Sequence, residues 1–243
     1  MTSDRVDFFI VGAMKSGTTS LRSVLGRSPD VDACPREMHF FDNDDNFARG
    51  FDWYHAQFGP ARPGVRRGEK SPSYGFSAEG AARIADYNPD ARILWIFRDP
   101  VARAVSNYYH ARRRRDDAPA LEHAIDNRLA LERRNAKTAY VYRSEYQKHL
   151  DNFARFPSEQ MRILIFEEVL EGGRPDIAET FGFLGVRAPA KVGFPHSNEG
   201  DAELRETNPV SSATIAELRR LLRPTVEAIE ERLGRRIPAW SRA

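Results

Sequence analysis

The segment from Phe8 to Leu21 constrains the fold of this chain more than any other. An apolar run ends at Gly12, a second glycine follows five residues later at Gly17, and apolar residues then recur at helical spacing. A buried strand, a glycine-containing turn and a helix start form a cradle in which backbone N–H groups and the helix dipole point at one anion. The segment therefore predicts a phosphate-binding loop, and an incidental glycine turn is the alternative interpretation.

The loop differs from the Walker A motif, G-x-x-x-x-G-K-[ST], at one position. Thr18 stands where that motif has its lysine, and the only lysine of the loop is Lys15, three residues earlier. A nucleoside-triphosphate enzyme sends the Walker lysine to the β- and γ-phosphates. We therefore expect a single phosphate, held by the backbone N–H groups of Ser16, Gly17, Thr18 and Thr19, with the two threonine hydroxyls as further donors.

The composition excludes several classes of protein. The 243 residues are 41% hydrophobic and 30% charged, which suits one large α/β domain, and we expect a single domain over 1–243. The net charge of +2 gives no reason to expect a nucleic-acid partner. The one cysteine, Cys34, excludes an internal disulfide and a multi-cysteine metal site, and it suits a reducing compartment.

No segment of the sequence reads as a targeting signal or a membrane span. Residues 1–7 are mostly polar and lead directly into the first apolar run. No run approaches the ~18 apolar residues of a transmembrane helix. We therefore expect a cytoplasmic protein without a membrane span.

Segments typical of strands and of helices alternate along the chain. This alternation predicts the α/β class, a P-loop-like three-layer sandwich with a central parallel sheet and helices on both faces. The predicted strands are 6–11, 31–35, 91–97 and 161–166; the predicted helices are 18–25, 51–58, 77–86, 100–115, 120–134, 142–156, 176–184 and 211–233, the last broken near Pro224; and the predicted loops include 43–50, 59–68 and 187–209.

A second candidate anion site follows the strand at 91–97. Arg98 ends that strand, and Ser106 lies eight residues later, about two turns into the next helix at ~3.6 residues per turn. Ligands of parallel sheets bind at the carboxyl ends of the strands, and the fork of an arginine pairs well with phosphate oxygens. The alternative is an arginine paired with Asp99 and a serine on a helix surface.

A candidate acid–base pair lies at Glu37 and His39. In an extended segment, residues two apart point to the same side, and the following Phe40 and Phe41 would anchor the segment in the core. Aromatic surroundings can raise the pKa of a carboxyl group towards the working range of a general base. A surface Glu–His pair beside core phenylalanines is the alternative.

Four segments together resemble the PAPS-dependent sulfotransferases, where PAPS is 3′-phosphoadenosine 5′-phosphosulfate. The resemblance is to the branch with the heparan sulfate N- and 3-O-sulfotransferases and with bacterial relatives that modify small molecules and polyketides. It covers about residues 6–184. In the order of the chain, residues 9–21 resemble the family's 5′-phosphosulfate loop, 37–42 the segment of its catalytic glutamate, 69–74 the segment of a second catalytic lysine, and 92–108 its 3′-phosphate motif.

The resemblance implies a role for each candidate residue. Glu37 would be the general base, Lys15 would neutralise charge on the leaving 5′-phosphate, Lys70 would assist at the sulfuryl group, and His39 and Asp42 would position the acceptor or orient Glu37. PAPS would be the co-substrate and PAP the product, and no metal is required because no β- and γ-phosphates need to be bridged. The implied cofactor-binding residues are Lys15, Ser16, Gly17, Thr18, Thr19, Ser20, Arg98, Ser106 and Arg205.

Parts of the chain depart from the family pattern. The heparan enzymes have a disulfide-bearing hairpin near their last cofactor segment, whereas Phe194 to Pro209 contains no cysteine. Arg205 is therefore only an approximate match to the basic residues there. The resemblance implies a small-molecule or saccharide acceptor, modified at a hydroxyl or, less often, an amine; the oligomeric state stays open.

Two further features have competing interpretations. Trp53, Tyr54, Tyr74 and Tyr109 are either walls of an acceptor cleft or core residues. The run from Arg112 to Arg115 either recruits an acidic acceptor or is a solvated helix end, and we favour the second because arginines suit the C-terminal helix dipole.

Two other functions compete with sulfuryl transfer. A P-loop nucleotide kinase is disfavoured by Thr18 at the Walker lysine position. A non-catalytic nucleotide-binding protein on the same fold is disfavoured because the expected set is complete: Lys15, Glu37, Lys70, Arg98 and Ser106.

Overall fold

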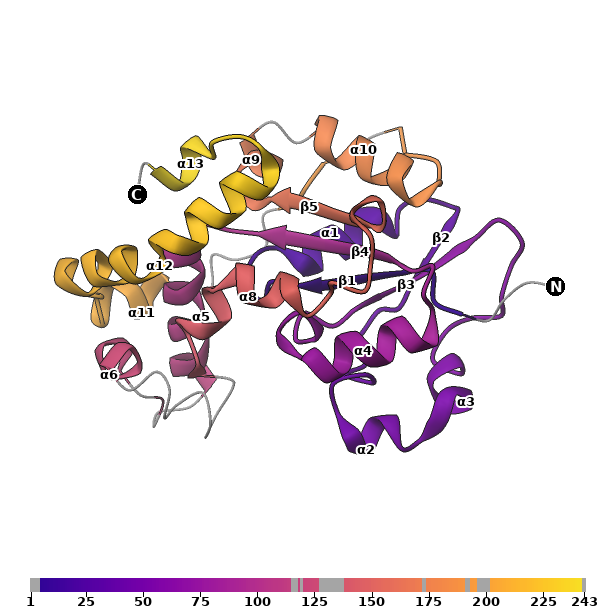
Figure 1. The fold of residues 1–243 in the computed structure, drawn as a ribbon, viewed down its shortest axis with the longest axis horizontal. Helices are drawn as coiled ribbons and strands as arrows, with labels where there is room; N and C mark the ends of the chain where they lie inside the picture. The colour runs from indigo at the N-terminus through magenta and orange to yellow at the C-terminus, as the bar shows by residue number, and fades with distance from the viewer. Residues whose placement is uncertain are drawn as a thin grey trace. The chain divides into compact units, whose positions relative to one another are not determined.

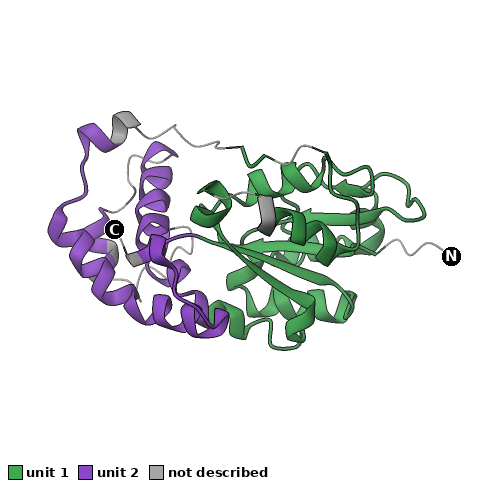
Figure 2. Ribbon diagram, turned by 90° about the horizontal axis from the view of Figure 1, so that it is seen from above, with its two compact units in different colours: residues 1–97, 148–196 green, residues 98–147, 197–243 purple. Residues whose placement is uncertain are grey.

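The computed structural model describes residues 5–114, 118, 120–126, 138–171, 174–190, 193–195 and 202–241. The chain divides into two compact units (Figure 2), one made of residues 1–97 and 148–196 and the other of residues 98–147 and 197–243. The single domain expected over 1–243 stays a prediction.

The first unit is built on a five-stranded parallel sheet (Figure 1), which confirms the predicted α/β class. The strand order is β2-β3-β1-β4-β5, which places β1 at the centre. The strands are β1 Phe8–Gly12, β2 Val31–Ala33, β3 Arg66–Lys70, β4 Arg92–Phe97 and β5 Met161–Ile165.

Helices cover both faces of this sheet. Alternate residues of a strand point to opposite faces, and Phe8 and Ile10 of β1 pack in one buried cluster with Leu21 of α1 and Phe181 of α10. Phe9 faces the other side, where its ring lies 6.5 Å from the ring of Tyr87 of α4. The helices of this unit include α1 Thr18–Leu25, α2 Asp44–Phe47, α3 Gly50–His55, α4 Ala78–Tyr87, α9 Phe166–Glu171 and α10 Arg174–Leu184.

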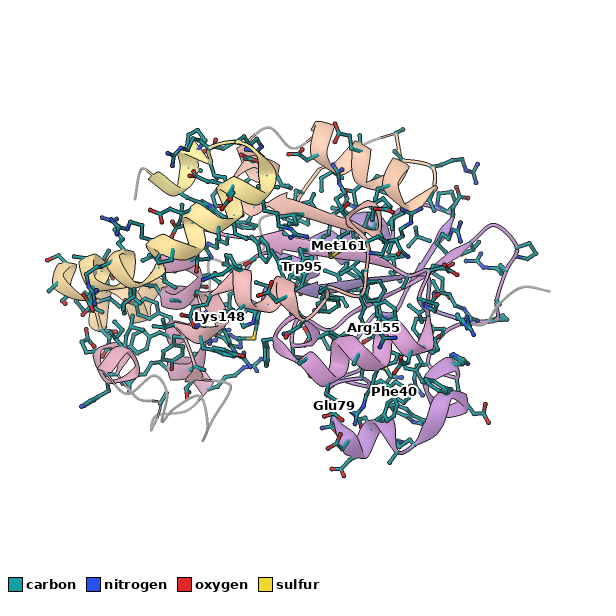
Figure 3. The ribbon with its side chains drawn as sticks, viewed as in Figure 1. Phe40, Glu79, Trp95, Lys148, Arg155 and Met161 are labelled. Carbon is teal, nitrogen blue, oxygen red and sulfur yellow. The ribbon has the colours of Figure 1, made fainter. Side chains whose placement is uncertain are left out.

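Aromatic side chains dominate the face of the sheet that α4 covers. Trp95 of β4, labelled in Figure 3, is buried in this layer. Its ring lies 5.3 Å from that of Phe153. Phe40 and Phe41 are fully buried, and Phe41 packs 5.6 Å from Phe9. The predicted anchoring of the 37–42 segment by its two phenylalanines is therefore confirmed.

The second unit is helical. Its elements are α5 Pro100–Arg114, α6 Leu121–Asp126, the 3-10 helix η3 Tyr142–Ser144, α11 Ala202–Thr207, α12 Ser212–Leu233 and α13 Pro238–Ser241. Tyr108 of α5 and Leu218 and Leu222 of α12 share its apolar core. Arg103 of α5 is fully buried and donates hydrogen bonds to Ser144 Oγ, Asn107 Oδ1 and the carbonyl of Tyr140.

Several predicted boundaries are wrong. Three elements lie wholly or partly in predicted loops: α2 lies within 43–50, β3 begins at Arg66 inside 59–68 and continues to Lys70, and α11 lies within 187–209. The predicted helix at 142–156 is divided between η3 and α8 Tyr146–Asp151. The helix α12 continues through Pro224, which lies on its exposed side, where water can reach the carbonyl that loses its hydrogen bond. Of the predicted helix 120–134, residues 127–134 lie outside the described part of the chain.

No helix within the described ranges combines the length and the apolar character needed to cross a lipid bilayer.

Candidate active site

The glycine loop joins the end of β1 to the start of α1. The helix begins at Thr18, and Gly17 before it has a left-handed backbone with φ of 86°. A Cβ at Gly17 would lie 2.7 Å from the ring of Phe166, so only glycine fits there. The first turn of α1 has no acidic residue, and no side chain caps it. The free N–H groups and the positive dipole end of this helix therefore have no carboxylate from its own first turn beside them.

Several polar groups of the loop have hydrogen-bonding capacity that the helix ladder does not use. Ser16 Oγ is buried and has no hydrogen-bond partner among the described residues. The first amide of the helix ladder is that of Leu21, which donates to the carbonyl of Gly17 at 2.9 Å, so the amides of Thr18 and Thr19 precede the ladder. The amide of Ser16 is directed at the carbonyl of Ala13 at 3.3 Å.

The loop hydroxyls differ in what they can offer. Thr19 Oγ1 accepts a hydrogen bond from Lys70 Nζ at 3.0 Å, so its own hydrogen is left to donate. Ser20 Oγ donates to the carbonyl of Pro195 at 2.8 Å, so its hydroxyl hydrogen is directed away from an anion in the loop. Lys15 is half-buried in the turn with φ of 71°.

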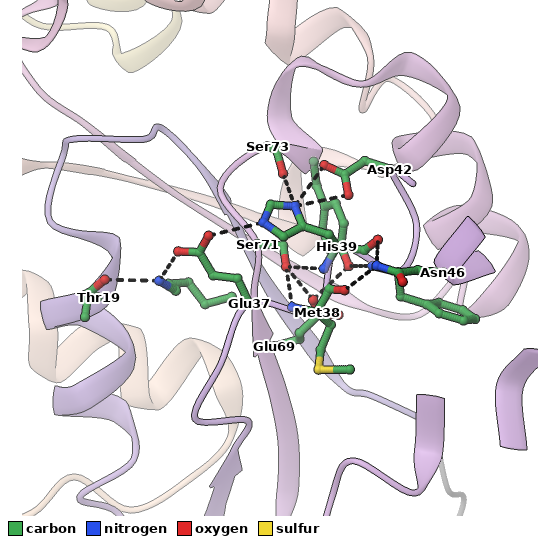
Figure 4. Close-up of polar contacts among 12 residues, drawn as sticks. Thr19, Glu37, Met38, His39, Asp42, Asn46, Glu69, Ser71 and Ser73 are labelled. Atoms are coloured by element: carbon green, nitrogen blue, oxygen red, sulfur yellow. Dashed lines mark hydrogen bonds and ion pairs between the residues drawn. The ribbon is translucent and has the colours of Figure 1, made fainter. Parts of the chain in front are cut away.

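A chain of charged side chains runs from the loop to the 37–42 segment (Figure 4). Lys70 Nζ, at the end of β3, lies 2.5 Å from Glu37 Oε1. The other oxygen of Glu37 lies 3.3 Å from His39 Nε2, and His39 Nδ1 lies 3.4 Å from both carboxylate oxygens of Asp42. The hydroxyl of Ser73 lies 2.9 Å from the same Nδ1. Four predicted catalytic residues are thus brought together.

The electrostatics of this chain differ from the sequence-based expectation. Burial raises the pKa of Glu37, but hydrogen bonds from His39 and Lys70 outweigh burial and lower the pKa from 4.5 to about 2. The prediction that aromatic surroundings raise it is therefore wrong. Hydrogen bonds to Asp42 and Glu37 raise the pKa of His39 from 6.5 to about 9. At neutral pH the carboxylate is charged and the imidazole is protonated.

Glu37 and His39 meet for a different reason from the one predicted. The segment is neither strand nor helix, and His39 has a left-handed backbone with φ of 47°. Ser71 Oγ accepts hydrogen bonds from the amides of Met38 and His39, both at 3.1 Å. Asn46 Nδ2 donates to the carbonyls of the same two residues, both at 3.2 Å. Side chains, rather than a strand ladder, therefore hold the segment.

Three residues of the site were not predicted from the sequence: Ser71, Ser73 and Asn46. Ser71 and Ser73 follow Lys70 in a Ser-Pro-Ser turn, which was the only available signal. Asn46 falls in a polar stretch without any signal, because its contacts are with backbone atoms seven and eight residues away.

The aromatic residues considered as cleft walls are mostly core residues. Tyr54 and Tyr74 are fully buried, and their hydroxyls donate to Glu69. Tyr109 is 3% exposed and donates to the carbonyl of Asn208. Trp53 is half-buried and stacks against the guanidinium of Arg49 at 3.9 Å.

Three predicted cofactor residues belong to the second unit. Arg98 directly follows β4 and is half-buried, and its carbonyl accepts from the hydroxyl of Tyr146 at 2.8 Å. Ser106 of α5 is 4% exposed. The guanidinium of Arg205, on α11, lies 5.1 Å from the ring centre of Tyr109.

The arginine run ends α5, as the favoured interpretation requires. Arg112 is half-buried and donates to the carbonyl of Ala118, and Arg113 and Arg114 are exposed. Arg115 lies outside the described residues. The carboxylate of Asp99 accepts from the amide of Ala102 at 2.6 Å near the start of the same helix.

Comparison with known proteins identifies the family. The model of the sulfotransferase domain matches residues 5–200. The chain is 31% identical over 182 residues to mouse heparan sulfate glucosamine 3-O-sulfotransferase 5, a match covering 73% of this chain and 52% of that protein. The human enzyme 3B1 is 31% identical over 179 residues, covering 73% of this chain and 45% of its own length.

Solved structures agree with this assignment. A sulfotransferase from Alicyclobacillus acidocaldarius superposes with a TM-score of 0.79 at 28% identity, covering 98% of this chain and 99% of that one. The chain therefore belongs to the PAPS-dependent sulfotransferase family, as the four segments predict. It spans about half the length of the curated relatives it matches.

Proposed function

We propose that this protein transfers the sulfuryl group of PAPS to a hydroxyl, or less often an amine, of a saccharide or small-molecule acceptor and releases PAP. One observation carries the proposal: Lys70 Nζ contacts both Thr19 of the anion loop and the carboxylate of Glu37. A cation that connects a phosphate cradle to a carboxylate base suits a reaction in which charge moves from an acceptor to a leaving phosphate.

The donor fits the groups available in each unit. Ser16 Oγ, which has no partner in the described part of the chain, and the start of α1, which no side chain caps there, suit the 5′-phosphate end of PAPS. Arg98, Ser106 and Arg205 supply a guanidinium, a hydroxyl and a second guanidinium for the 3′-phosphate. PAPS has two anionic ends, and the sequence offers two anion-binding sets.

In the proposed reaction Glu37 removes the proton of the acceptor hydroxyl as the oxygen attacks sulfur. The new O–S bond forms in line with the S–O bond that breaks, and Lys15 neutralises the charge that develops on the departing 5′-phosphate. Lys70 assists at the sulfuryl oxygens. A Lys70 ammonium that turns towards the sulfuryl group leaves Glu37 with one cation fewer, so the pKa of Glu37 rises when its basicity is needed.

His39 and Asp42 orient the carboxylate of the proposed base, Glu37. Protonated His39 donates to Glu37 on one side and to Asp42 on the other, and Asp42 thereby fixes the orientation of the ring. The pair orients the carboxylate of Glu37 and leaves its Oε1, now shared with Lys70, to face the acceptor.

The acceptor is proposed only as a class. The curated relatives are named as sulfotransferases of heparan sulfate glucosamine, and a saccharide or small-molecule hydroxyl is the corresponding proposal for this chain.

Two measurements test the function. In calorimetry, PAP should bind at least about tenfold more tightly than ATP, whereas a kinase would prefer ATP. In an acceptor screen with radiolabelled PAPS, label should move to a saccharide, phenol or hydroxylated metabolite; tight PAP binding without any transfer would support a non-catalytic protein instead.

A further inference from the structure

A buried carboxylate, Glu69, is connected through hydroxyl groups to the 37–42 segment, which we call the catalytic segment because it holds the proposed base. Glu69 is the fourth residue of β3 and is 1% exposed. Three hydroxyl groups donate to it: Tyr54 OH to Oε2 at 2.5 Å, and Ser71 Oγ and Tyr74 OH to Oε1 at 2.7 and 2.8 Å. The reaction described above makes no use of Glu69, although burying a carboxyl group is costly.

The direction of each of these hydrogen bonds is fixed by its neighbours. A backbone N–H can only donate, so Ser71 Oγ must accept from the amides of Met38 and His39, and Tyr74 OH must accept from the amide of Phe40 at 2.9 Å. Each hydroxyl has a single hydrogen, and that hydrogen therefore points at Glu69. The two hydroxyls form a relay that connects one carboxylate with the three consecutive amides of residues 38–40, and the amide of Phe41 lies farther from Tyr74 OH, at 3.4 Å. Figure 4 shows the Ser71 branch.

These three amides need such partners. They lie in a segment without a helix or strand ladder, where a buried unpaired N–H would be costly. The segment also contains the left-handed His39, and a non-glycine residue holds that conformation only when its surroundings fix it. Burial raises the pKa of Glu69, while the hydroxyl donors counteract that rise by stabilising its charged form.

We propose that Glu69 is a positioning residue: through the Ser71 and Tyr74 hydroxyls it fixes the backbone of residues 38–40 and thereby sets where Glu37 and His39 stand. Its catalytic consequence rests on the proposed function, but its structural part does not. Glu69 touches no reacting group, and its neighbour Lys70 points along the other side of the strand, to Thr19 and Glu37.

The chain offers a matched pair of variants that isolates the relay. Tyr54 and Tyr74 are both fully buried and both donate to Glu69, yet only the Tyr74 hydroxyl accepts from the catalytic segment. Y54F and Y74F each remove one buried hydroxyl and keep the ring. Y74F and Ser71→Ala should each remove a hydrogen-bond acceptor of the amides of residues 38–40, whereas Y54F should not. Glu69→Gln keeps the size and shape of the side chain. It replaces one carboxylate oxygen by an NH2 group, which cannot accept the hydrogen bonds that the three hydroxyls donate.

The first measurement is hydrogen exchange of the free protein, resolved to residues 38–40. We expect exchange to accelerate at least about tenfold in Y74F, S71A and E69Q and to stay at the wild-type rate in Y54F. This result depends on no substrate. Equal rates in Y54F and Y74F, or unchanged protection in E69Q, would overturn the positioning role even if the protein is a sulfotransferase.

The second measurement is turnover with an acceptor found in the screen. We expect kcat to fall by about ten- to a hundredfold in Y74F, S71A and E69Q, with the Kd of PAP unchanged, because misplacement by ~1 Å is enough for such a loss. Y54F should keep its kcat, although its unfolding temperature falls as that of Y74F does. If kcat instead follows the unfolding temperature in all four variants, Glu69 is merely structural.

Discussion

The ammonium of Lys70 lies 2.5 Å from a carboxylate oxygen of Glu37. The side chain of Lys70 is 7% exposed, whereas that of Glu37 is 40% exposed. The side chain of the lysine is therefore enclosed by protein atoms, and the carboxylate is the open end of the pair. This asymmetry suits a base that must reach an acceptor and a cation that must stay beside the phosphate loop.

Lys70→Met should lower kcat by about 10²- to 10³-fold, which is the usual cost of removing one charge-stabilising donor. The Kd of PAP should change little, since PAP has no sulfuryl group. The pKa of Glu37 should rise in this variant because its lysine partner is gone. Lys148→Met, which removes an exposed lysine, is the control. A kcat of K70M equal to that of the control would contradict the role of Lys70.

His39 should titrate far above the range of an ordinary histidine. Its pKa is raised from 6.5 to about 9 by Asp42 first and Glu37 second, so its charge contributes stability fully below about pH 6.5 and loses that contribution as the pH rises through about 9. NMR of the ring protons should give a midpoint near 9, and Asp42→Asn should lower it. A wild-type midpoint at or below 6.5 would mean that the ion pairs do not form in solution.

Gly17→Ala should lower the free energy of unfolding by about 1–3 kcal/mol, because a Cβ there meets the ring of Phe166 and the backbone has φ of 86°. The same variant should also bind PAP more weakly than the wild type does. Gly182→Ala is the matched control: it lies in α10 with nothing within 4 Å of the added Cβ, and it should raise the unfolding free energy by about 0.4–1 kcal/mol. Urea denaturation measures both, and an equal effect of the two substitutions would argue against a constrained loop.

Arg98→Gln should weaken the binding of PAP by about tenfold or more and leave the binding of adenosine 5′-phosphate within about twofold, because only PAP has the 3′-phosphate assigned to Arg98. Calorimetry with the two nucleotides measures the ratio. Arg113→Gln, at the exposed end of α5, should change neither value. An equal loss of affinity for both nucleotides would mean that Arg98 does not recognise the 3′-phosphate.

The strand, turn and helix start of the glycine loop could be predicted from the sequence because their signal is local. The apolar strand, the two glycines and the helix start are all contained in Phe8 to Leu21, and β4 was equally clear as an apolar run. The start of α4, predicted at residue 77, also has a local signal, since Ser77 accepts from the amide of Gly80 three residues later.

The strand β3 could not be predicted because its burial depends on distant partners. Its residues Arg67, Glu69 and Lys70 are polar and no strand was predicted over them, yet each is at most 5% exposed. Glu69 is buried against Tyr54 and Tyr74, and no periodicity in the sequence anticipates such contacts. The pKa of Glu37 was mispredicted for the same reason, because Lys70 comes from 33 residues away.

Transfer of label from radiolabelled PAPS by the wild type and by Glu37→Gln tests the proposed function most directly. The variant keeps the size of the side chain, and Glu79→Gln on the exposed side of α4 controls for a lost surface carboxylate. We expect one PAP per sulfated product in the wild type and in E79Q, and a kcat lower by about 10²- to 10⁴-fold in E37Q with the Kd of PAP unchanged. Near-wild-type turnover in E37Q would contradict the assignment of Glu37 as the base, and His39 would then be tested next.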